Sequence, residues 1–145
     1  MRPRRFSEVE AYQHAEDQYF YRPLVAGKEL FTYIAHVPSG GTMPPDAEEA
    51  EEFELSLFML QGMLQVTLAD DRFALYQGEA LHIPRTVPFG VENTTDHTAS
   101  FLLSFSPPPR VDLDTMRERA EANGRTVLDP EECQRRFGPF AILED

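Results

Sequence analysis

The sequence predicts an all-β fold, an antiparallel sandwich or barrel, followed by short helices. Residues 29–105 contain about eight short runs in which apolar and polar residues alternate, as expected for half-buried strands. Turn residues separate these runs at intervals of roughly 8–12 residues, and no helical period interrupts them. The length of 145 residues fits a single domain.

Three segments are expected along this domain. Residues 1–24 form an irregular N-terminal arm, because no helical period persists there. The barrel occupies residues 25–108. Residues 109–145 form a helical tail that packs on the barrel, since helix signals appear only in this part of the chain.

The strands can be placed from their alternation. In the run 30–37, Phe31, Tyr33 and Val37 share one face, because successive strand residues point to opposite sides. Residues 38–41 end this strand with Pro, Ser and Gly. The later strands are expected at residues 53–60, 63–68, 72–76, 80–83, 89–92 and 99–105.

The tail contains signals for two helices. Asp112 or Asp114 is expected to cap a helix over residues 113–122, and Asn123-Gly124 is a typical stop. The run Asp129-Pro-Glu-Glu132 has the form of a capping box with Pro at the first helical position. It predicts a second short helix that ends before the next glycine.

The charge balance excludes several function classes. Thirteen Lys and Arg residues against 25 Asp and Glu residues give a net charge of −12, which disfavours nucleic acid and anionic membranes as partners. No apolar run approaches the ~20 residues of a transmembrane helix. No apolar segment follows the basic start, so no secretory signal is expected. A single cysteine, Cys133, excludes an internal disulfide, and we expect a cytoplasmic protein.

Residues 78–93 carry a spaced motif. Pro84 follows Gly78 after five residues, and Thr86, Phe89 and Asn93 continue the pattern. The spacing resembles the second motif of the cupin superfamily, which reads Gly, five residues, Pro-x-Gly, two residues, His, three residues, Asn. Every spacing agrees, but Thr86 stands at the second glycine and Phe89 at the metal-binding histidine.

The family's first motif is matched in spacing and altered in chemistry. Asp46 and Glu48 stand where the family has His-x-His, and Glu52 stands at the glutamate position. The closing glycine, Gly62, lies nine residues beyond Glu52 instead of six. When the motif is anchored on Gly62, its glutamate position falls on Leu55, and a short local insertion reconciles the two alignments.

The resemblance implies an antiparallel cupin (jelly-roll) β-barrel, closed at one end and open at the other, with a small-molecule pocket inside. It covers residues 25–106, and residues 124–130 are similar to the tails of single-domain, quercetin dioxygenase-like cupins. The family's metal centre needs about three imidazoles and one carboxylate on one ion. Because no histidine stands at those positions, we expect no transition metal and no other cofactor.

The acidic run leaves two interpretations open. Asp46 and Glu48, with Glu52 or Glu54, supply the oxygen ligands that a hard cation such as Mg²⁺ or Ca²⁺ prefers. A charge run is also typical of a solvated loop. Asp46 and Glu48 are therefore retained as candidate ligand-binding residues and not as metal ligands.

The remaining candidate ligand-binding residues are apolar. Leu55, Leu57 and Met59 share one strand face, and Phe89 occupies the last histidine position of the motif. Pockets for organic ligands are mostly apolar, and Phe89 would stack on a ligand while Met59 adapts to its shape. The alternative is that these side chains simply fill a small barrel.

His82 and Tyr33 are the candidate catalytic residues. His82 would serve as general acid or base if it faces the cavity, whereas a lone strand histidine is more often a structural, hydrogen-bonded residue. Tyr33 is the tyrosine on a predicted apolar strand face. His36 is expected to point away from that face.

The sequence thus predicts a cupin without the usual metal site that binds a small apolar or aromatic molecule. Metal-independent isomerisation, cyclisation or dehydration would suit it if it is an enzyme. The alternatives are a metal-dependent, quercetinase-like dioxygenase, with His82 or His36 and Glu48 and Glu54 rebuilding the metal site, or a non-catalytic ligand sensor. Exposed strand edges, together with the family resemblance, favour a homodimer.

Overall fold

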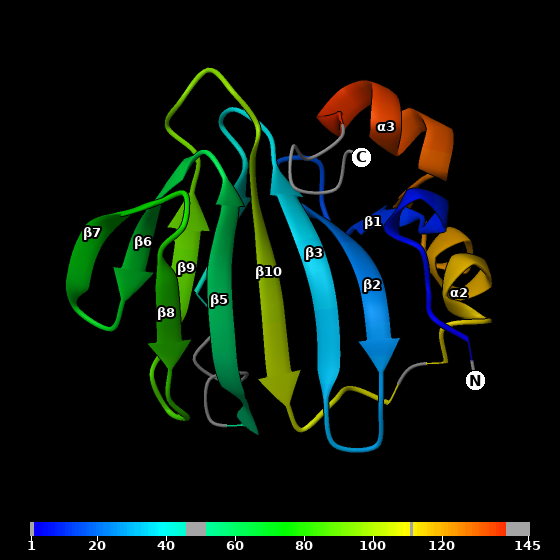
Figure 1. Cartoon of the computed structure of the whole chain (residues 1–145), viewed down its shortest axis with the longest axis horizontal. Helices are drawn as coiled ribbons and strands as arrows, with labels where there is room; N and C mark the ends of the chain where they lie inside the picture. Colours follow the sequence, from blue (N-terminus) through cyan, green and yellow to red (C-terminus); the bar gives the residue numbers. More distant parts are fainter. Residues whose placement is uncertain (1, 46–51, 111, 139–145) are drawn as a thin grey trace.

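The computed structural model describes residues 2–45, 52–110 and 112–138 and shows two β-sheets with short helices at one side (Figure 1). The larger sheet has the strand order β11-β1-β2-β3-β10-β5-β8, and the smaller sheet has the order β4-β9-β6-β7. The strands are β1 (Ala11–Gln13), β2 (Phe20–Ala26), β3 (Phe31–Val37), β4 (Thr42–Met43), β5 (Glu54–Gln61), β6 (Met63–Leu68), β7 (Asp71–Tyr76), β8 (Ala80–Ile83), β9 (Phe89–Glu92), β10 (Ala99–Ser106) and β11 (Thr126–Leu128). The predicted all-β class with short C-terminal helices is confirmed.

All pairings between these strands are antiparallel, and their register places the apolar faces together. Tyr33 of β3 lies opposite Leu103 of β10, which lies opposite Leu57 of β5. In the smaller sheet, Val66 of β6 lies opposite Val91 of β9. Since side chains alternate across a strand, each of these rows presents one face to the interior between the sheets.

That interior holds the main hydrophobic core. Both sheets contribute to it, and its buried members are Phe31, Tyr33, Ala35, Val37, Met43, Leu57, Met59, Leu64, Val66, Leu75, Ile83, Val91, Ala99, Phe101 and Leu103. Alternation within each strand explains this list, because the intervening residues of β5 and β6 are mostly more exposed than their neighbours.

The chain termini cover part of the outer face of the larger sheet. Residues 1–24, expected to be an irregular arm, contain β1 and all buried residues of β2, and both strands extend the sheet. A second core forms on this outer face between the arm and the C-terminal helix α3 (Pro130–Phe137), with Ala11, Phe20, Leu128, Cys133 and Phe137 as its buried members. Burial raises the pKa of the Cys133 thiol.

Stacked side chains pack the N-terminal arm and α3 against β3. His36 is fully buried on the outer face, where its ring stacks on Phe137 with centroids 4.2 Å apart. Its Nδ1 shares a 2.8 Å hydrogen bond with the hydroxyl of Ser100. Arg22 lies 3.7 Å over the Phe6 ring, and its guanidinium donates to the Phe6 and Val9 carbonyls at 2.8 and 3.1 Å. His36 therefore faces away from the interior, as expected, but it is enclosed by a second layer.

The C-terminal helices agree in part with the sequence. Asp129 caps α3 by accepting a 2.9 Å hydrogen bond from the Glu132 amide, so this cap is confirmed. The expected cap of the first helix is wrong, because α2 (Met116–Ala122) begins after Thr115 without a side-chain cap. Asp112 instead accepts from the Asp114 amide at 3.0 Å and forms a local turn, a common role of aspartate.

Within the described ranges, no helix is long and apolar enough to cross a bilayer. The short helices η1 (Phe6–Glu8), α2 and α3 lie beside β1 and β2, at the side of the larger sheet away from β8 (Figure 1).

Candidate functional site: the open end of the barrel

The two ends of the interior differ in how completely their side chains are buried. Met59 and Phe101 pair across β5 and β10 near the turn that leads into β6, and both are 0% exposed. Phe105 and Leu55 pair at the opposite ends of the same strands and are only partly buried. This end lies at the lower edge of the larger sheet in Figure 1. The side chains are therefore packed more tightly at the first end, called here the closed end, than at the second, called the open end.

Aromatic rings concentrate at the open end. Phe105 contacts Phe53 edge-on at 5.2 Å and Phe31 at 5.3 Å between ring centroids. Tyr33 lies 6.1 Å from Phe105 and 5.6 Å from Tyr21. Offset and edge-to-face contacts of this kind are the favoured arrangements of aromatic pairs. Of these rings, Phe31 and Tyr33 are buried in the core, whereas Phe53 and Phe105 are partly exposed.

The four predicted apolar pocket residues face the interior but differ in accessibility. Leu57 and Met59 are fully buried and fill the core, as the alternative interpretation held for them. Leu55 and Phe89 are partly buried and pack against that core from the open end. Of the predicted set, only Leu55 and Phe89 are thus placed where a ligand could reach them. The predicted ligand contacts Asp46 and Glu48 lie outside the described residues.

Tyr33 lies inside the barrel and is 6% exposed. Among the described residues, aromatic rings that lie near it include Tyr19 and Phe31, each with its ring centroid at 6.2 Å. Burial raises the pKa of the neighbouring Tyr21, and the Arg125 guanidinium partly offsets that increase. Tyr21 is consequently neutral near pH 7.

His82 lies on the outer face of the larger sheet, not in the interior. It pairs with Ser56 across β5 and β8, while its neighbour Ile83 points inward and is buried. The His82 side chain is 63% exposed, and its Nε2 lies 2.7 Å from Oε2 of Glu54. The condition for the proposed catalytic role, that His82 faces the cavity, is not met. Its contact with Glu54 is a surface ion pair when the imidazole is protonated.

The described residues do not fit a transition-metal centre. His36 and His82 lie on the outer face of the larger sheet, and His14 and His97 are exposed. Among residues 2–45, 52–110 and 112–138, no three His, Cys, Asp or Glu side chains gather closely enough to hold an ion. Phe89 occupies the position at which the cupin motif has its last histidine.

The second motif retains the backbone geometry that a glycine would favour. Thr86, at the motif's glycine position, has a φ of +74°. A β-branched residue rarely adopts this left-handed conformation, because its Cβ crowds the backbone. Gly78, which opens the motif, also has a positive φ of 86°. The loop after β8 therefore has the backbone conformation that the motif's glycine would adopt, and Phe89 stands at the position of the motif's histidine.

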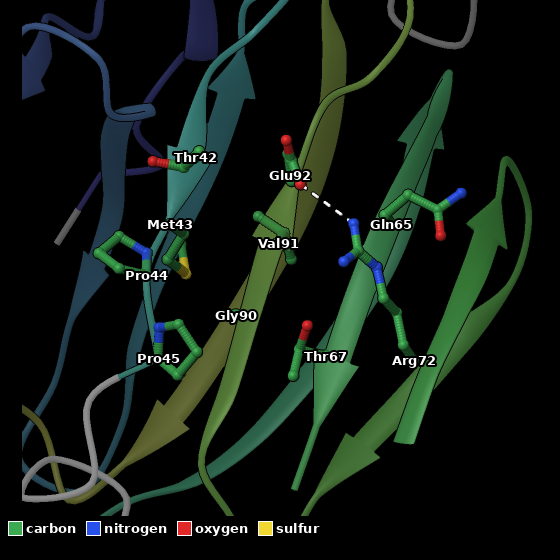
Figure 2. A pocket seen from close by; sticks show the side chains of 10 residues that line it. All are labelled: Thr42, Met43, Pro44, Pro45, Gln65, Thr67, Arg72, Gly90, Val91 and Glu92. Atoms are coloured by element: carbon green, nitrogen blue, oxygen red, sulfur yellow. Dashed lines mark hydrogen bonds and ion pairs between the residues drawn. The ribbon is translucent and has the colours of Figure 1, made fainter. Parts of the chain in front are cut away.

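A groove on the outer face of the smaller sheet was not anticipated from the sequence (Figure 2). It has a volume of ≈ 260 Å³, and it is lined by Thr42, Met43, Pro44, Pro45, Gln65, Thr67, Arg72, Gly90, Val91 and Glu92. The sequence pattern predicts only that the polar residues of β6 and β9, which line the groove, lie on the solvent face of their strands. Only the register of four strands brings them together.

Comparisons with known proteins place the chain in a family. Residues 33–105 match the cupin domain model, which is half of the chain. The protein belongs to the cupin family, and its two sheets form the double-layered barrel of that fold. No curated protein matches the sequence significantly.

Solved structures show the same fold. The polyketide cyclase RemF from Streptomyces resistomycificus is 23% identical, with 74% of this chain and 82% of that chain covered and a TM-score of 0.65. An RmlC-like cupin from Shewanella frigidimarina is 16% identical, with 76% and 93% covered and a TM-score of 0.66. KdgF from Halomonas sp. is 18% identical, with 68% and 87% covered and a TM-score of 0.61.

Proposed function

We propose that this cupin binds a small apolar or aromatic organic molecule at the open end of its barrel. The observation that carries the proposal is the loss of burial from Met59 and Phe101 to Leu55, Phe105 and Phe89 along the interior. Apolar concave surfaces with a few polar groups are typical of small-molecule sites. The fold is similar to that of a polyketide cyclase, which supports a small organic ligand.

Tyr33 is proposed as the group that orients the ligand and that would transfer a proton in a metal-independent reaction. Its phenol lies among the rings of Tyr21, Phe31 and Phe105, on the interior side of β3. A tyrosine hydroxyl can both donate and accept a hydrogen bond, as isomerisation, cyclisation or dehydration would require. The outward position of His82 removes it from this role.

A metal-dependent dioxygenase of the quercetinase type is the weaker candidate. It would need His36 or His82 as ligands, and both lie on the outer face of the larger sheet. Membership of the quercetin dioxygenase-like subgroup is a proposal. It is supported by the resemblance of residues 124–130 to the tails of those cupins. A non-catalytic ligand sensor would use the same open end.

The test uses tyrosine fluorescence, because the chain contains no tryptophan and five tyrosines. Titration with 2-naphthol, an uncharged bicyclic aromatic probe, is expected to quench this emission saturably. Phe89→Ala should weaken binding about tenfold by removing a stacking surface. Phe58→Ala is the matched control, because Phe58 lies on the outer face of β5 and is 42% exposed.

The two variants distinguish binding inside the barrel from binding on the outer face of the larger sheet. Equal loss of affinity in both variants would place the probe outside the barrel and contradict the proposal. Tyr33→Phe keeps the ring and removes the hydroxyl. It should weaken 2-naphthol by a few-fold and leave naphthalene unaffected, as expected for the loss of one hydrogen bond.

We also propose a homodimer. The short strand β8 is an edge of the larger sheet and β7 is an edge of the smaller one, and edge strands present unpaired main-chain groups. Light scattering on the purified protein should give twice the chain mass of 16.6 kDa. A mass of 16.6 kDa at micromolar concentration would contradict this proposal.

A further inference from the structure

The outer groove of the smaller sheet is a second concave site, separate from the barrel interior and from the function proposed above. It lies on the face of β6 opposite to the core residue Val66, and it includes Val91 of β9 in its lining. Thr67 and Gly90 form one cross-strand pair on its floor, and Gln65 and Glu92 form the next. A ligand here would not touch the open end of the barrel.

One wall of the groove is fixed by a glycine. A Cβ atom on Gly90 would lie 2.6 Å from Cδ of Pro45 and 2.8 Å from the Met43 carbonyl oxygen. Only a residue without a side chain therefore lets Pro45 pack against β9. Pro44, Pro45 and Met43 line this side of the groove and supply apolar surface.

The other side carries both signs of charge. Arg72 crosses from β7 over β6, and its Nη2 donates to Oε2 of Glu92 on β9 at 3.2 Å (Figure 2). The contact joins one nitrogen to one oxygen, and the two side chains are 62% and 50% exposed. In Figure 2 the Thr67 hydroxyl points toward the space beneath this pair. An exposed ion pair of this kind contributes little to stability, so separating its two side chains to bind a ligand costs little free energy.

We propose that the groove binds a free α-amino acid with an apolar side chain. Its carboxylate would accept hydrogen bonds from Arg72, its ammonium would donate to Glu92, and its side chain would lie on Pro44 and Pro45. A simple anion or cation would satisfy only one member of the ion pair. The volume of ≈ 260 Å³ is below the roughly 300–1,000 Å³ of pockets for drug-sized ligands, which favours a molecule of this size.

The test is a backbone-amide NMR titration with L-leucine, with 4-methylpentanoate and isoamylamine as the analogues that lack one charge each. We expect leucine to shift the amides of Thr67, Gly90 and Glu92 and to bind about tenfold more tightly than either analogue. Arg72→Gln and Glu92→Gln should each weaken leucine about tenfold, since each removes a charge-assisted hydrogen bond. Arg119→Gln, on α2, is the matched control and should bind leucine normally.

Two results would overturn the proposal. One is that leucine leaves these amides unmoved at tens of millimolar. The other is that 4-methylpentanoate binds as tightly as leucine and Glu92→Gln has no effect, which would define an anion site. Both variants replace exposed side chains, so we expect each to keep the native fold. Unchanged chemical shifts of amides away from the groove check this. The 2-naphthol titration of Arg72→Gln, expected to be unchanged, distinguishes failure here from failure of the barrel site.

Discussion

The closed and open ends of the barrel are built from the same strands but serve different purposes. At the closed end, Met59 and Phe101 are fully buried, and the outer layer with His36 lies behind β3 near the same end. At the open end, Leu55, Phe105 and Phe89 remain partly accessible. We therefore expect substitutions at the closed end to change stability most, and substitutions at the open end to change the proposed binding.

The largest expected effect is on stability at the closed end. Phe101→Ala should lower the free energy of unfolding by about 3–5 kcal/mol, because it removes buried surface and leaves a cavity. Phe105→Ala should cost about half as much, since Phe105 is partly exposed. Denaturant unfolding of the two variants measures the difference. Equal costs would show that the open end is packed as tightly as the closed one.

The outer layer behind the closed end should make the protein sensitive to acid. Burial, with a smaller contribution from Arg22, lowers the pKa of His36 from 6.5 to about 3. The folded state then binds fewer protons than the unfolded state between these values, so stability is present above pH 6.5 and is lost as the pH falls.

His36→Phe tests this origin of acid sensitivity. The wild type should lose roughly 2–3 kcal/mol between pH 6 and pH 4, at about 1.4 kcal/mol per unit of depressed pKa. The variant should lose clearly less over the same range, as measured by urea unfolding. Parallel pH profiles for the two proteins would assign the acid sensitivity to other groups.

A smaller effect is expected in the loop after β8, next to the open end. Thr86→Gly should raise the free energy of unfolding by about 1 kcal/mol, because glycine adopts the observed positive φ without crowding. Thr95→Gly is a contrasting control, since its hydroxyl and amide bond to Asn93 at 2.7 and 2.9 Å. A destabilised Thr86→Gly variant would show that the side chain makes contacts worth more than the strain.

The smallest effect concerns metal. Phe89→His returns one imidazole to the second motif, but the described residues supply no second one on the interior face. Elemental analysis of this variant should show no more tightly bound transition metal than the wild type. Stoichiometric metal in the single variant would mean that the first motif is misread.

Alternation and turn residues were sufficient to predict the all-β class and the strands β3 and β5 to β10, but not β1, β2, β4 and β11. The interior position of Tyr33, Leu57 and Met59 follows from period-two patterning alone. The same patterning could not reveal that the opposite face is also covered near His36, because the covering segments come from both ends of the chain. A strand that is buried on both faces has a nearly continuous apolar sequence. The segment Ile34-Ala-His-Val37 of β3 comes close to this pattern.

The candidate site was predictable only in part. Motif spacing located Phe89 and Leu55 at the accessible end, yet it placed His82 in the right strand without giving its side. The groove with Arg72 and Glu92 depends on the register between β7, β6 and β9, which no local pattern encodes. Turn chemistry also misled the prediction at Asp112, whose carboxylate bonds within a turn instead of capping α2.

The central claim is that ligands enter at the open end of the barrel. Intermolecular NOEs between 2-naphthol and the side chains of the isotopically labelled protein test it most directly. The account predicts contacts to Leu55, Phe89 and Phe105 and none to Phe58. Contacts confined to Phe58 and its neighbours on the outer face, or no contacts at saturating probe, would contradict it.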